Sequence, residues 1–478
     1  MASWILSEPT RVTRLCLLAG CLLARGVVLG QEPNPVPTQS DSKAHFAEQG
    51  DFARNGDLPL DSEAADLARR LAEVEDKLLQ RDEADRTAKA AAAKKFSVRP
   101  FGRIHIDAAT ISQDDANKAT VGNALNGVDI RRARMGLEGE GFDIFFYRFD
   151  VDFVTPDSVT GTRPTIFDAY LDVQKLPIVG NIRAGHFREP FSLERLDSSH
   201  DNPFLERSNP LDALTPFRNI GVMAFDWNAN ETRTWSYGVF HESTNEFGES
   251  QRDATALAFT GRTTWLPWYE EHEDGPHLWH VGASYTYRNL KSQERGFDQT
   301  PEVVLKEGLT VTPNFVDTGL IALRDYHVVG VETVTSRGPF SMQGEYVFLT
   351  GQKTDTSRVF FHGGYLETTY WLTGEHRNYN RRMGSHGAVP PNCNFYCRQT
   401  DCGTETGSGA WEVAARVSYL NLNSGTVQGG SLTDLTLGLN WNYAVRSRVM
   451  FNYIHAFLDR GGLNSNADIF SVRFQFTF

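Results

Sequence analysis

The C-terminal segment, residues 468–478, alternates strictly between apolar and polar side chains. Because successive side chains of a strand point to opposite faces, one face carries Phe470, Val472, Phe474, Phe476 and Phe478. The other face carries Ser471, Arg473, Gln475 and Thr477. A two-faced strand of about 9 to 11 residues is what a tilted strand of a transmembrane β-barrel requires. The final strand of a soluble sandwich alternates in the same way, so this segment alone leaves both architectures open.

Composition excludes two broad classes of protein. Beyond the N-terminus the chain has no run of about 18 apolar residues, which rules out a polytopic helical membrane protein. Sixty acidic and 47 basic residues give a formal net charge of -13, which argues against a nucleic-acid partner. The mean hydropathy of -0.39 is compatible with a large membrane barrel, because only alternate strand residues meet lipid.

The N-terminus has the pattern of an exported protein. Residues 1–30 predict a signal peptide, since two arginines precede a mostly apolar stretch at 15–29. The sequence around Cys21 also resembles a lipoprotein processing site, which leaves lipidation of Cys21 open as the less favoured alternative. Residues 31–60 are rich in Pro, Asn, Gln, Ser and Asp without periodicity, and predict a flexible linker.

Residues 61–95 predict a helix with the seam of a short coiled coil. Leu67, Leu71, Val74 and Leu78 are spaced four, three and four residues apart, as at the a and d positions of heptads. A seam of about two to three heptads is marginal by itself, so we expect it to assist a trimer that is joined elsewhere. A solvated spacer helix is the alternative, because the run 90–93 is all alanine and offers no adhesive face.

After residue 96 the sequence predicts strands up to the C-terminus, which gives an all-β domain at 96–478. Sixteen segments alternate or are rich in strand-forming residues: 98–111, 128–139, 144–154, 165–174, 181–187, 219–227, 234–242, 254–265, 278–289, 324–336, 339–350, 362–373, 410–421, 432–443, 448–458 and 468–478. An even number of this size is typical of bacterial single-chain barrels, so the predicted fold is a transmembrane antiparallel β-barrel of about 16 strands.

The connections between these segments alternate between short and long. The short ones are 139–143, 175–180, 228–233, 336–339 and 444–447, and the long ones include 188–218 and 290–323. A membrane barrel has short periplasmic turns and longer external loops, whereas a sandwich has no such rule. Connections 266–277 and 374–409 are long where a short turn is expected, which predicts either large periplasmic excursions or missed strands.

Charged residues in the clearest strands share one parity. Leu435, Leu437 and Leu439 are expected to face lipid, and Thr436 and Asn440 to face water. In segment 144–154 the charged residues are Arg148, Asp150 and Asp152, which alternate with aromatic and aliphatic residues. Because a charged group on the lipid face costs about 2 to 4 kcal/mol at mid-membrane, we expect these side chains in the lumen.

Four blocks carry a family resemblance: DIRRARMGLEG at 129–139, AGHFREPFSLE at 184–194, YWLTGEHR at 370–377 and GAWEVAAR at 409–416. Together with the aromatic C-terminus they make residues 98–478 similar to the phosphate-selective porin O/P family. The resemblance implies a trimeric, 16-stranded outer-membrane barrel. It also implies that arginines guide anions into a constriction narrowed by an inward-folded loop.

The resemblance places candidate anion-binding residues in two segments. In the first, Arg131, Arg132 and Arg134 would line the pore wall; Arg132 and Arg134 share a face, whereas Arg131 has the opposite parity and is expected at the rim. Arginine suits phosphate because its planar guanidinium donates paired hydrogen bonds and stays charged. The second segment, 188–218, is the expected constriction loop and contributes Arg188, Arg195, Arg207, Arg218, Ser198 and Ser199.

Two observations weaken phosphate selectivity as a prediction. The loop also contains Glu189, Glu194, Asp197, Asp201, Glu206 and Asp212, which outnumber its arginines. Such acids would neutralise the field and suit a general or sugar-accepting pore about equally well. The arginines could also be structural, paired with Asp150, Asp152 or Glu138 in the lumen wall.

No catalytic residues, cofactor or metal site are predicted. The sequence has no His-Glu-x-x-His, no Gly-x-Ser-x-Gly and no phosphate-cradling glycine loop. The acidic run 270–274 with His277 is more typical of a solvated turn than of a metal site. Cys393, Cys397 and Cys402, with His376 and His386 nearby, could form a zinc knuckle. One disulfide plus a free thiol is favoured in an exported protein.

The sequence thus predicts a porin, not an enzyme, in the outer membrane of a Gram-negative-type bacterium, surrounded by lipid and assembled as a homotrimer. Small hydrophilic solutes would diffuse through it passively, with anions such as phosphate preferred over neutral ones. The alternatives are a general or sugar-accepting porin and a structural or adhesive barrel whose long loops plug the lumen. A barrel enzyme would need a base and a nucleophile that converge at one rim, and the sequence offers no such pair.

Overall fold

The computed structural model describes residues 62–93, 96–157, 161–242, 256–305, 312–400 and 403–478. The predicted signal peptide and linker, with Cys21, lie outside these ranges, and both remain predictions.

Helix α2 (Ser62–Ala93) occupies the segment for which heptads were predicted. Leu71, Val74 and Leu78 of the seam are 61%, 55% and 58% exposed in the single chain. A partner helix for this seam therefore remains a prediction. Across the described ranges, no helix is both long enough and apolar enough to cross a membrane.

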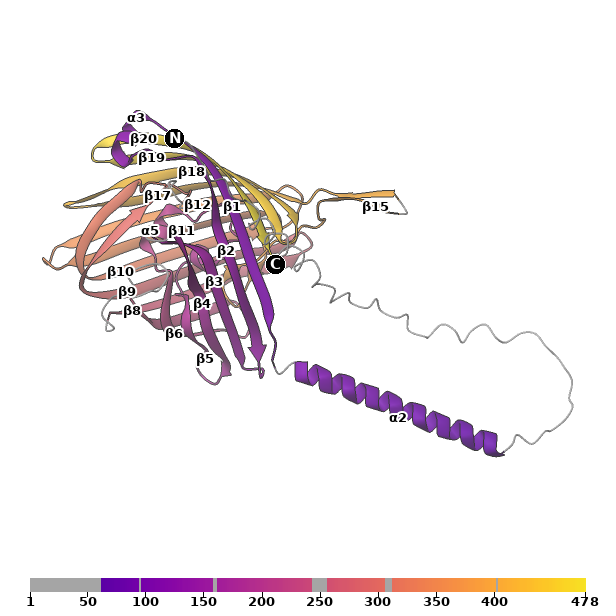
Figure 1. The fold of residues 1–478 in the computed structure, drawn as a ribbon. Coiled ribbons are helices and arrows are strands. Elements are labelled where there is room, and N and C mark those ends of the chain that lie inside the picture. Colours follow the sequence, from indigo (N-terminus) through magenta and orange to yellow (C-terminus); the bar gives the residue numbers. More distant parts are fainter. Residues whose placement is uncertain (1–61, 94–95, 158–160, 243–255, 306–311, 401–402) are drawn as a thin grey trace, which may run out of the picture. The chain divides into compact units, whose positions relative to one another are not determined.

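The predicted fold class is confirmed: sixteen antiparallel strands close into a barrel (Figure 1). They are β1 (Arg99–Gln113), β2 (Gly127–Gly141), β3 (Phe145–Asp157), β4 (Gly161–Leu176), β5 (Gly180–Arg188), β6 (Arg218–Trp227), β7 (Arg233–His241), β8 (Leu257–His272), β9 (Gly275–Gln299), β10 (Val316–Arg337), β11 (Phe340–Lys353), β12 (Arg358–Trp371), β17 (Ala410–Ser424), β18 (Val427–Ala444), β19 (Ser447–Arg460) and β20 (Leu463–Thr477). Each strand pairs with its neighbours in chain order, and β20 pairs with β1 to close the sheet.

Smaller elements lie in the connections. Helix α3 (Asp115–Val121) follows β1, and α4 (Leu193–Leu196) and α5 (Asn209–Leu214) follow β5. Between β12 and β17 lie two small hairpins: β13 (Tyr379–Asn380) with β14 (Ser385–His386), and β15 (Tyr396–Thr400) with β16 (Gly403–Gly407).

The two connections that broke the predicted alternation have different explanations. The first is a tight turn, because β8 continues to His272 and pairs there with Gly275 at the start of β9. The prediction of a long connection at 266–277 was therefore wrong, since the acidic run extends the strand. The second, 372–409, contains only the small hairpins among its described residues and joins adjacent barrel strands. It lies at the end of the barrel that carries the short turns, because successive connections of an antiparallel barrel alternate between ends.

Strands β9 and β10 are 25 and 22 residues long, which shortens the predicted connection 290–323. A bilayer needs only about 9 to 11 residues of a tilted strand, so both strands extend beyond the membrane. Their outer parts are more polar and lose the alternation from which the predicted boundaries were taken.

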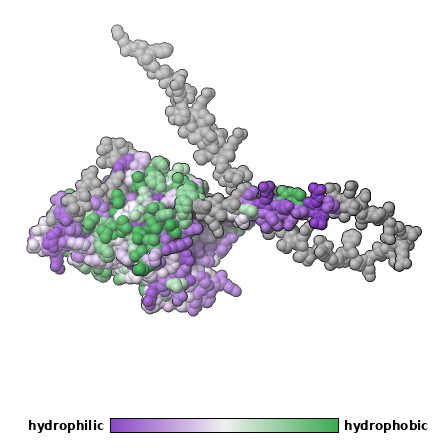
Figure 2. Space-filling view, turned by 90° about the horizontal axis from the view of Figure 1, so that it is seen from below, coloured by the Kyte–Doolittle hydropathy of each residue, from purple (hydrophilic) through white to green (hydrophobic). Residues whose placement is uncertain are grey.

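The predicted faces are confirmed. In β20, Phe470 is 62% exposed on the outside, whereas Arg473 is 0% exposed on the inside. In β18, Leu435 and Leu437 are exposed, and Thr436 and Asn440 are buried. Figure 2 shows hydrophobic side chains gathered over the middle of the visible barrel surface, with hydrophilic ones toward its rims. This distribution matches an outer surface that meets lipid.

The connection between β5 and β6, residues 189–217, folds into the barrel. Its Phe191 and Leu211 are fully buried and pack with Leu349 and Phe361 of the inner wall. These apolar side chains would be exposed to water if the loop projected outward, so their burial favours the inward position. Asn209 Nδ2 donates to Asp434 Oδ2 on β18 at 2.9 Å. The loop therefore crosses the lumen.

Candidate permeation site

The structure brings the nine candidate residues together around two cavities beside the crossing loop. Seven of them line a cavity of about 60 Å³: Arg131, Arg132, Arg134, Arg188, Arg195, Ser199 and Arg207. Ser198 and Arg218 line a larger cavity of about 250 Å³, to which Arg188 also belongs. Residues from β2 and from the loop are therefore neighbours in space. Their binding of anions is addressed below as a proposal.

Arg131 departs from its predicted place at the rim. Pairing of β1 with β2 passes from His105 opposite Arg132 to Asp107 opposite Asp129, so β2 contains one extra residue. This β-bulge interrupts the alternation and lets consecutive side chains point the same way. Arg131 Nε lies 3.0 Å from Glu206 Oε1, and Arg132 Nη2 lies 2.9 Å from Glu206 Oε2.

Glu206 anchors the loop to the wall. Besides Arg131 and Arg132, Arg473 of β20 reaches it, with Nη2 2.7 Å from Oε1. Burial alone would raise the pKa of Glu206, but the three guanidinium groups hold this pKa well below its usual range. The carboxylate is therefore charged at neutral pH and ties the loop to β2 and β20.

Four other acids of the loop also have partners. Glu194 pairs with Arg416 at 3.1 Å and Glu189 with Arg288 at 2.8 Å. Asp212 pairs with Arg195, and Asp197 accepts from the backbone N–H of His386 at 2.7 Å. Glu189 and Glu194 have their charge offset by arginines of the wall, whereas Asp212 pairs within the loop and Asp197 with the connection between β12 and β17. The excess of loop acids predicted from the sequence therefore does not translate into an equally negative passage.

Part of the predicted alternative, structural salt bridges, is present. Arg134 Nε lies 2.6 Å from Asp152 Oδ2. Arg218 Nε lies 2.9 Å from Asp168 Oδ1, a partner that the sequence did not suggest. Both arginines are therefore largely neutralised as components of the wall.

Three other arginines have no carboxylate within 4.0 Å among the residues that the structure describes. Arg103 Nη1 donates to Ser198 Oγ at 3.2 Å and to Ser199 Oγ at 3.1 Å. Arg188 donates to three loop carbonyls, the nearest being that of Leu196 at 2.6 Å. Arg207 donates to two more carbonyls, each at 2.9 Å. These side chains retain their positive charge.

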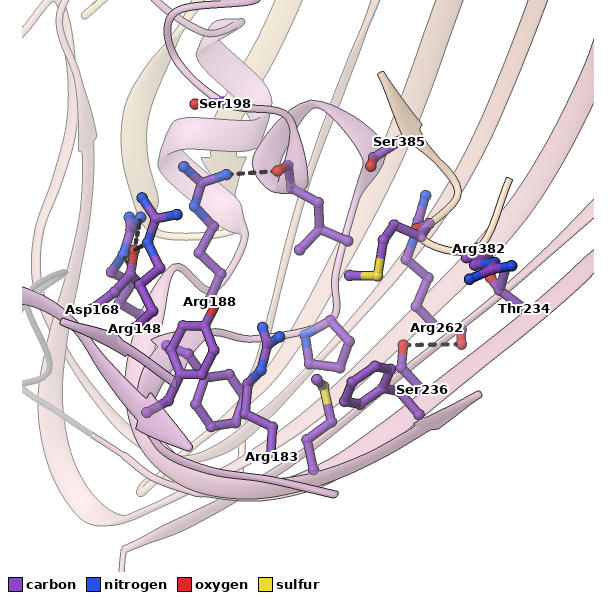
Figure 3. A pocket seen from close by; sticks show the side chains of 18 of the residues that line it. Arg148, Asp168, Arg183, Arg188, Ser198, Thr234, Ser236, Arg262, Arg382 and Ser385 are labelled. Atoms are coloured by element: carbon purple, nitrogen blue, oxygen red, sulfur yellow. Dashed lines mark hydrogen bonds and ion pairs between the residues drawn. The ribbon is translucent and has the colours of Figure 1, made fainter. Parts of the chain in front are cut away.

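Arg103, Arg148 and Arg183 also line the larger cavity; none was a candidate anion-binding residue, although Arg148 was expected in the lumen. Figure 3 shows Arg148, Asp168 and Arg188 on one side of this cavity, Arg262 and Arg382 on the other, and Arg183 between them. Their inward parity on β1, β3 and β5 was the available signal. No short motif marks them, and their neighbours come from distant parts of the chain.

Within the described ranges, no group of three or more His, Cys, Asp or Glu side chains is placed to hold a metal ion. Cys393 is exposed with a free thiol. Cys402 lies outside the described residues, so the predicted disulfide remains a prediction. His386 Nδ1 lies 2.9 Å from Asp197 Oδ2 and so contributes to fixing the loop.

Comparison with known proteins identifies the family. The family described as phosphate-selective porin O and P matches residues 98–478. Porin O of Pseudomonas aeruginosa is 26% identical over 421 residues, which cover 80% of this chain and 89% of that protein. An uncharacterized protein of Caulobacter vibrioides is 27% identical over 371 residues, which cover 75% of this chain and 68% of that protein.

Solved porin structures were also found. An anion-selective porin from Comamonas acidovorans aligns with a TM-score of 0.48 and 13% identity, covering 80% of this chain and 100% of that one. The outer membrane channel DcaP of Acinetobacter baumannii aligns with a TM-score of 0.48 and 11% identity, covering 80% and 98%. On the strength of the family match and the closed barrel, the chain belongs to the phosphate-selective porin O and P family and is an outer-membrane diffusion channel.

Proposed function

We propose that the channel prefers anions and that loop 189–217 forms its constriction. The observation that carries this proposal is the position of Arg103, Arg188 and Arg207. All three lie at the crossing loop without a carboxylate partner among the described residues. In a narrow passage, a few such side chains determine the field that a solute meets, whatever the net charge of the whole protein.

The mechanism combines exclusion by size with attraction by charge. The two cavities described beside the loop have volumes of about 60 and 250 Å³, which favours the exclusion of large solutes. A small anion would exchange hydration water for guanidinium donors. Phosphate is the favoured solute, because a guanidinium donates two parallel hydrogen bonds to its oxygens. Each contact must stay weak enough for the anion to leave.

The zero-current potential of channels in a planar bilayer under a KCl gradient tests this proposal. We expect the wild-type potential to show preference for chloride, and Arg103→Gln with Arg188→Gln to move it toward equal permeation. Arg324→Gln is the matched control, because Arg324 is more than half exposed and pairs with Asp325 away from the loop. Cation preference in the wild type, or equal shifts in the control, would contradict the proposal.

Currents in phosphate and in chloride, together with liposome swelling in a neutral sugar, address the alternative of a general pore. The alternative is favoured if the acids along the loop and their arginine partners cancel each other's charge, because the passage then carries little net field. Passage of sugar at the rate of phosphate would reject phosphate preference and leave the channel assignment intact.

We also propose a homotrimer in the outer membrane of a Gram-negative bacterium, with residues 1–30 removed on export and residues 31–60 as a linker. The exposed seam of α2 supports a role in assembly, because apolar residues at a and d positions are buried when helices pair. Chemical cross-linking of the purified protein in detergent tests this proposal, and a monomer throughout would contradict it.

A further inference from the structure

The larger cavity has more room than an inorganic phosphate requires. Its volume of about 250 Å³ corresponds to roughly eight waters of liquid. Phosphate has only five heavy atoms. The cavity is bounded by inward-facing wall residues, by Pro190, Leu196 and Ser198 of the loop, and by Met383 and Ser385 from the excursion between β12 and β17.

Three arginines offer unused donors to this cavity. Arg183 donates from Nε and Nη2 to the two carboxylate oxygens of Asp172, at 2.7 and 2.8 Å, which leaves Nη1. Arg188 uses only Nη1, and Arg103 uses only Nη1. Within the part of the chain that the structure describes, the remaining nitrogens of these side chains have no hydrogen-bond acceptor. An anionic head group would supply one.

The same cavity has an apolar wall. Tyr170, Phe187, Met223 and Phe225 line it, from three neighbouring strands. Met223 and Phe225 are 5% and 8% exposed and belong to a buried apolar cluster with Phe187. The lumen of a diffusion barrel is normally polar, so apolar side chains at inward positions are unexpected.

The charged and apolar parts are in contact. The guanidinium carbon of Arg183 lies 3.9 Å from the ring centre of Tyr170 and 5.4 Å from that of Phe225. Figure 3 shows Arg183 in the middle of the cavity, flanked by rings. A planar apolar group placed against these rings would have guanidinium donors at its edge. Inorganic phosphate would gain nothing from the apolar wall.

We propose that this cavity is a binding site for aromatic anions, that is, molecules carrying a carboxylate or phosphate on a planar ring. Arg103, Arg183 and Arg188 hold the anionic head, and the ring lies against Met223 and Phe225. This inference rests on one part of the proposed function, namely that anions enter the lumen. It adds a class of solute that the resemblance to phosphate-selective porins does not suggest.

Block of the chloride current through single channels tests the site. Benzoate is compared with acetate, and phenyl phosphate with inorganic phosphate, so each pair differs in the ring alone. We expect each ring-bearing anion to interrupt the current at roughly tenfold lower concentration than its partner, because the ring leaves water for an apolar wall. Uncharged benzyl alcohol should have no effect in this range. If the ring makes a difference only between benzoate and acetate, the site accepts carboxylates; if only between phenyl phosphate and inorganic phosphate, it accepts phosphates.

Two variants locate the effect. Phe225→Leu removes a ring from the cavity wall while keeping an apolar side chain, and should abolish most of the difference between benzoate and acetate. Phe451→Leu makes the same change at a lipid-facing position of β19 outside the cavity and should preserve it. Normal conductance in KCl shows that each variant has folded, and Met223→Ala replaces Phe225→Leu if that variant does not insert.

Equal block by benzoate and acetate, equal block by benzyl alcohol, or an effect unchanged by Phe225→Leu and Met223→Ala would overturn the inference. Its failure is distinct from failure of the proposed function. If only the aromatic-anion site is wrong, the zero-current potential still shows a preference for chloride. If the proposed function is wrong, it does not.

Discussion

Replacing Glu206 by glutamine removes the charge that ties the loop to the barrel wall. The substitution keeps the size and planarity of the side chain. Arg131 and Arg132 lose their carboxylate partner, whereas Arg473 retains Asp107, whose Oδ2 lies 2.6 Å from its Nη2. The local positive charge increases by one.

The cost follows from burial. Glu206 and Arg132 are each about 5% exposed at the side chain, and removal of one partner from a buried pair costs about 3 to 5 kcal/mol. We expect the lower end, about 3 kcal/mol, because Arg473 keeps a second acid and water in the lumen solvates the freed guanidinium groups. This corresponds to roughly a hundredfold shift toward the undocked state of this part of the loop. Contacts such as Asn209 with Asp434 keep the remainder in place.

Two measurements on Glu206→Gln report this effect. Urea titration in lipid vesicles should show a lower free energy of unfolding, and single-channel recording should show increased noise in the open current. Asp325→Asn is the control, because its partner Arg324 is 55% exposed, and a pair in contact with water contributes less than about 1 kcal/mol. If Glu206→Gln unfolds and conducts like Asp325→Asn, the loop is not anchored as described.

Three further predictions follow from other parts of the molecule. Burial raises the pKa of Asp201 on the loop to about 6, so this carboxyl group is protonated as pH falls from 7 to 5. Because the lumen then loses a negative charge, the zero-current potential should show a stronger preference for chloride at pH 5 in the wild type. The Asp201→Asn variant should show no such change. The double variant Leu71→Asp, Leu78→Asp places charges in the seam of α2 and should lower the fraction of cross-linked trimer at low protein concentration, while the conductance stays unchanged. An unaltered trimer fraction would argue against a role for α2 in assembly. Leu437→Lys places a charge on the lipid face of β18 and should lower the free energy of unfolding in vesicles by about 2 to 4 kcal/mol, whereas no change would place this position outside the bilayer.

The sequence predicted the strands well wherever lipid and lumen lie on opposite sides of the wall. The contrast between Phe470 and Arg473 in β20 is an example, since each residue's environment is decided by parity alone. Strand ends were less predictable. Beyond the membrane the outward face of β9 and β10 meets water instead of lipid, so the alternation fades although the hydrogen-bonded ladder continues.

The candidate site was predicted in part. The arginine block of β2 and the loop were identified, but parity misplaced Arg131 because a bulge is not visible in the sequence pattern. Pairing depends on which distant strands approach the loop, as for Glu206 with Arg473. The same reason explains why Arg103 was missed: its significance comes from the loop serines that it contacts.

The account depends most on the claim that the arginines beside the loop that have no carboxylate partner among the described residues concentrate anions. Anomalous diffraction from crystals grown in bromide tests this claim directly, because bromide replaces chloride and its position is measured. We predict bromide peaks in the lumen next to Arg103 and Arg188. Bromide confined to the outer surface, with both arginine side chains ordered and no peak beside them, would contradict the account.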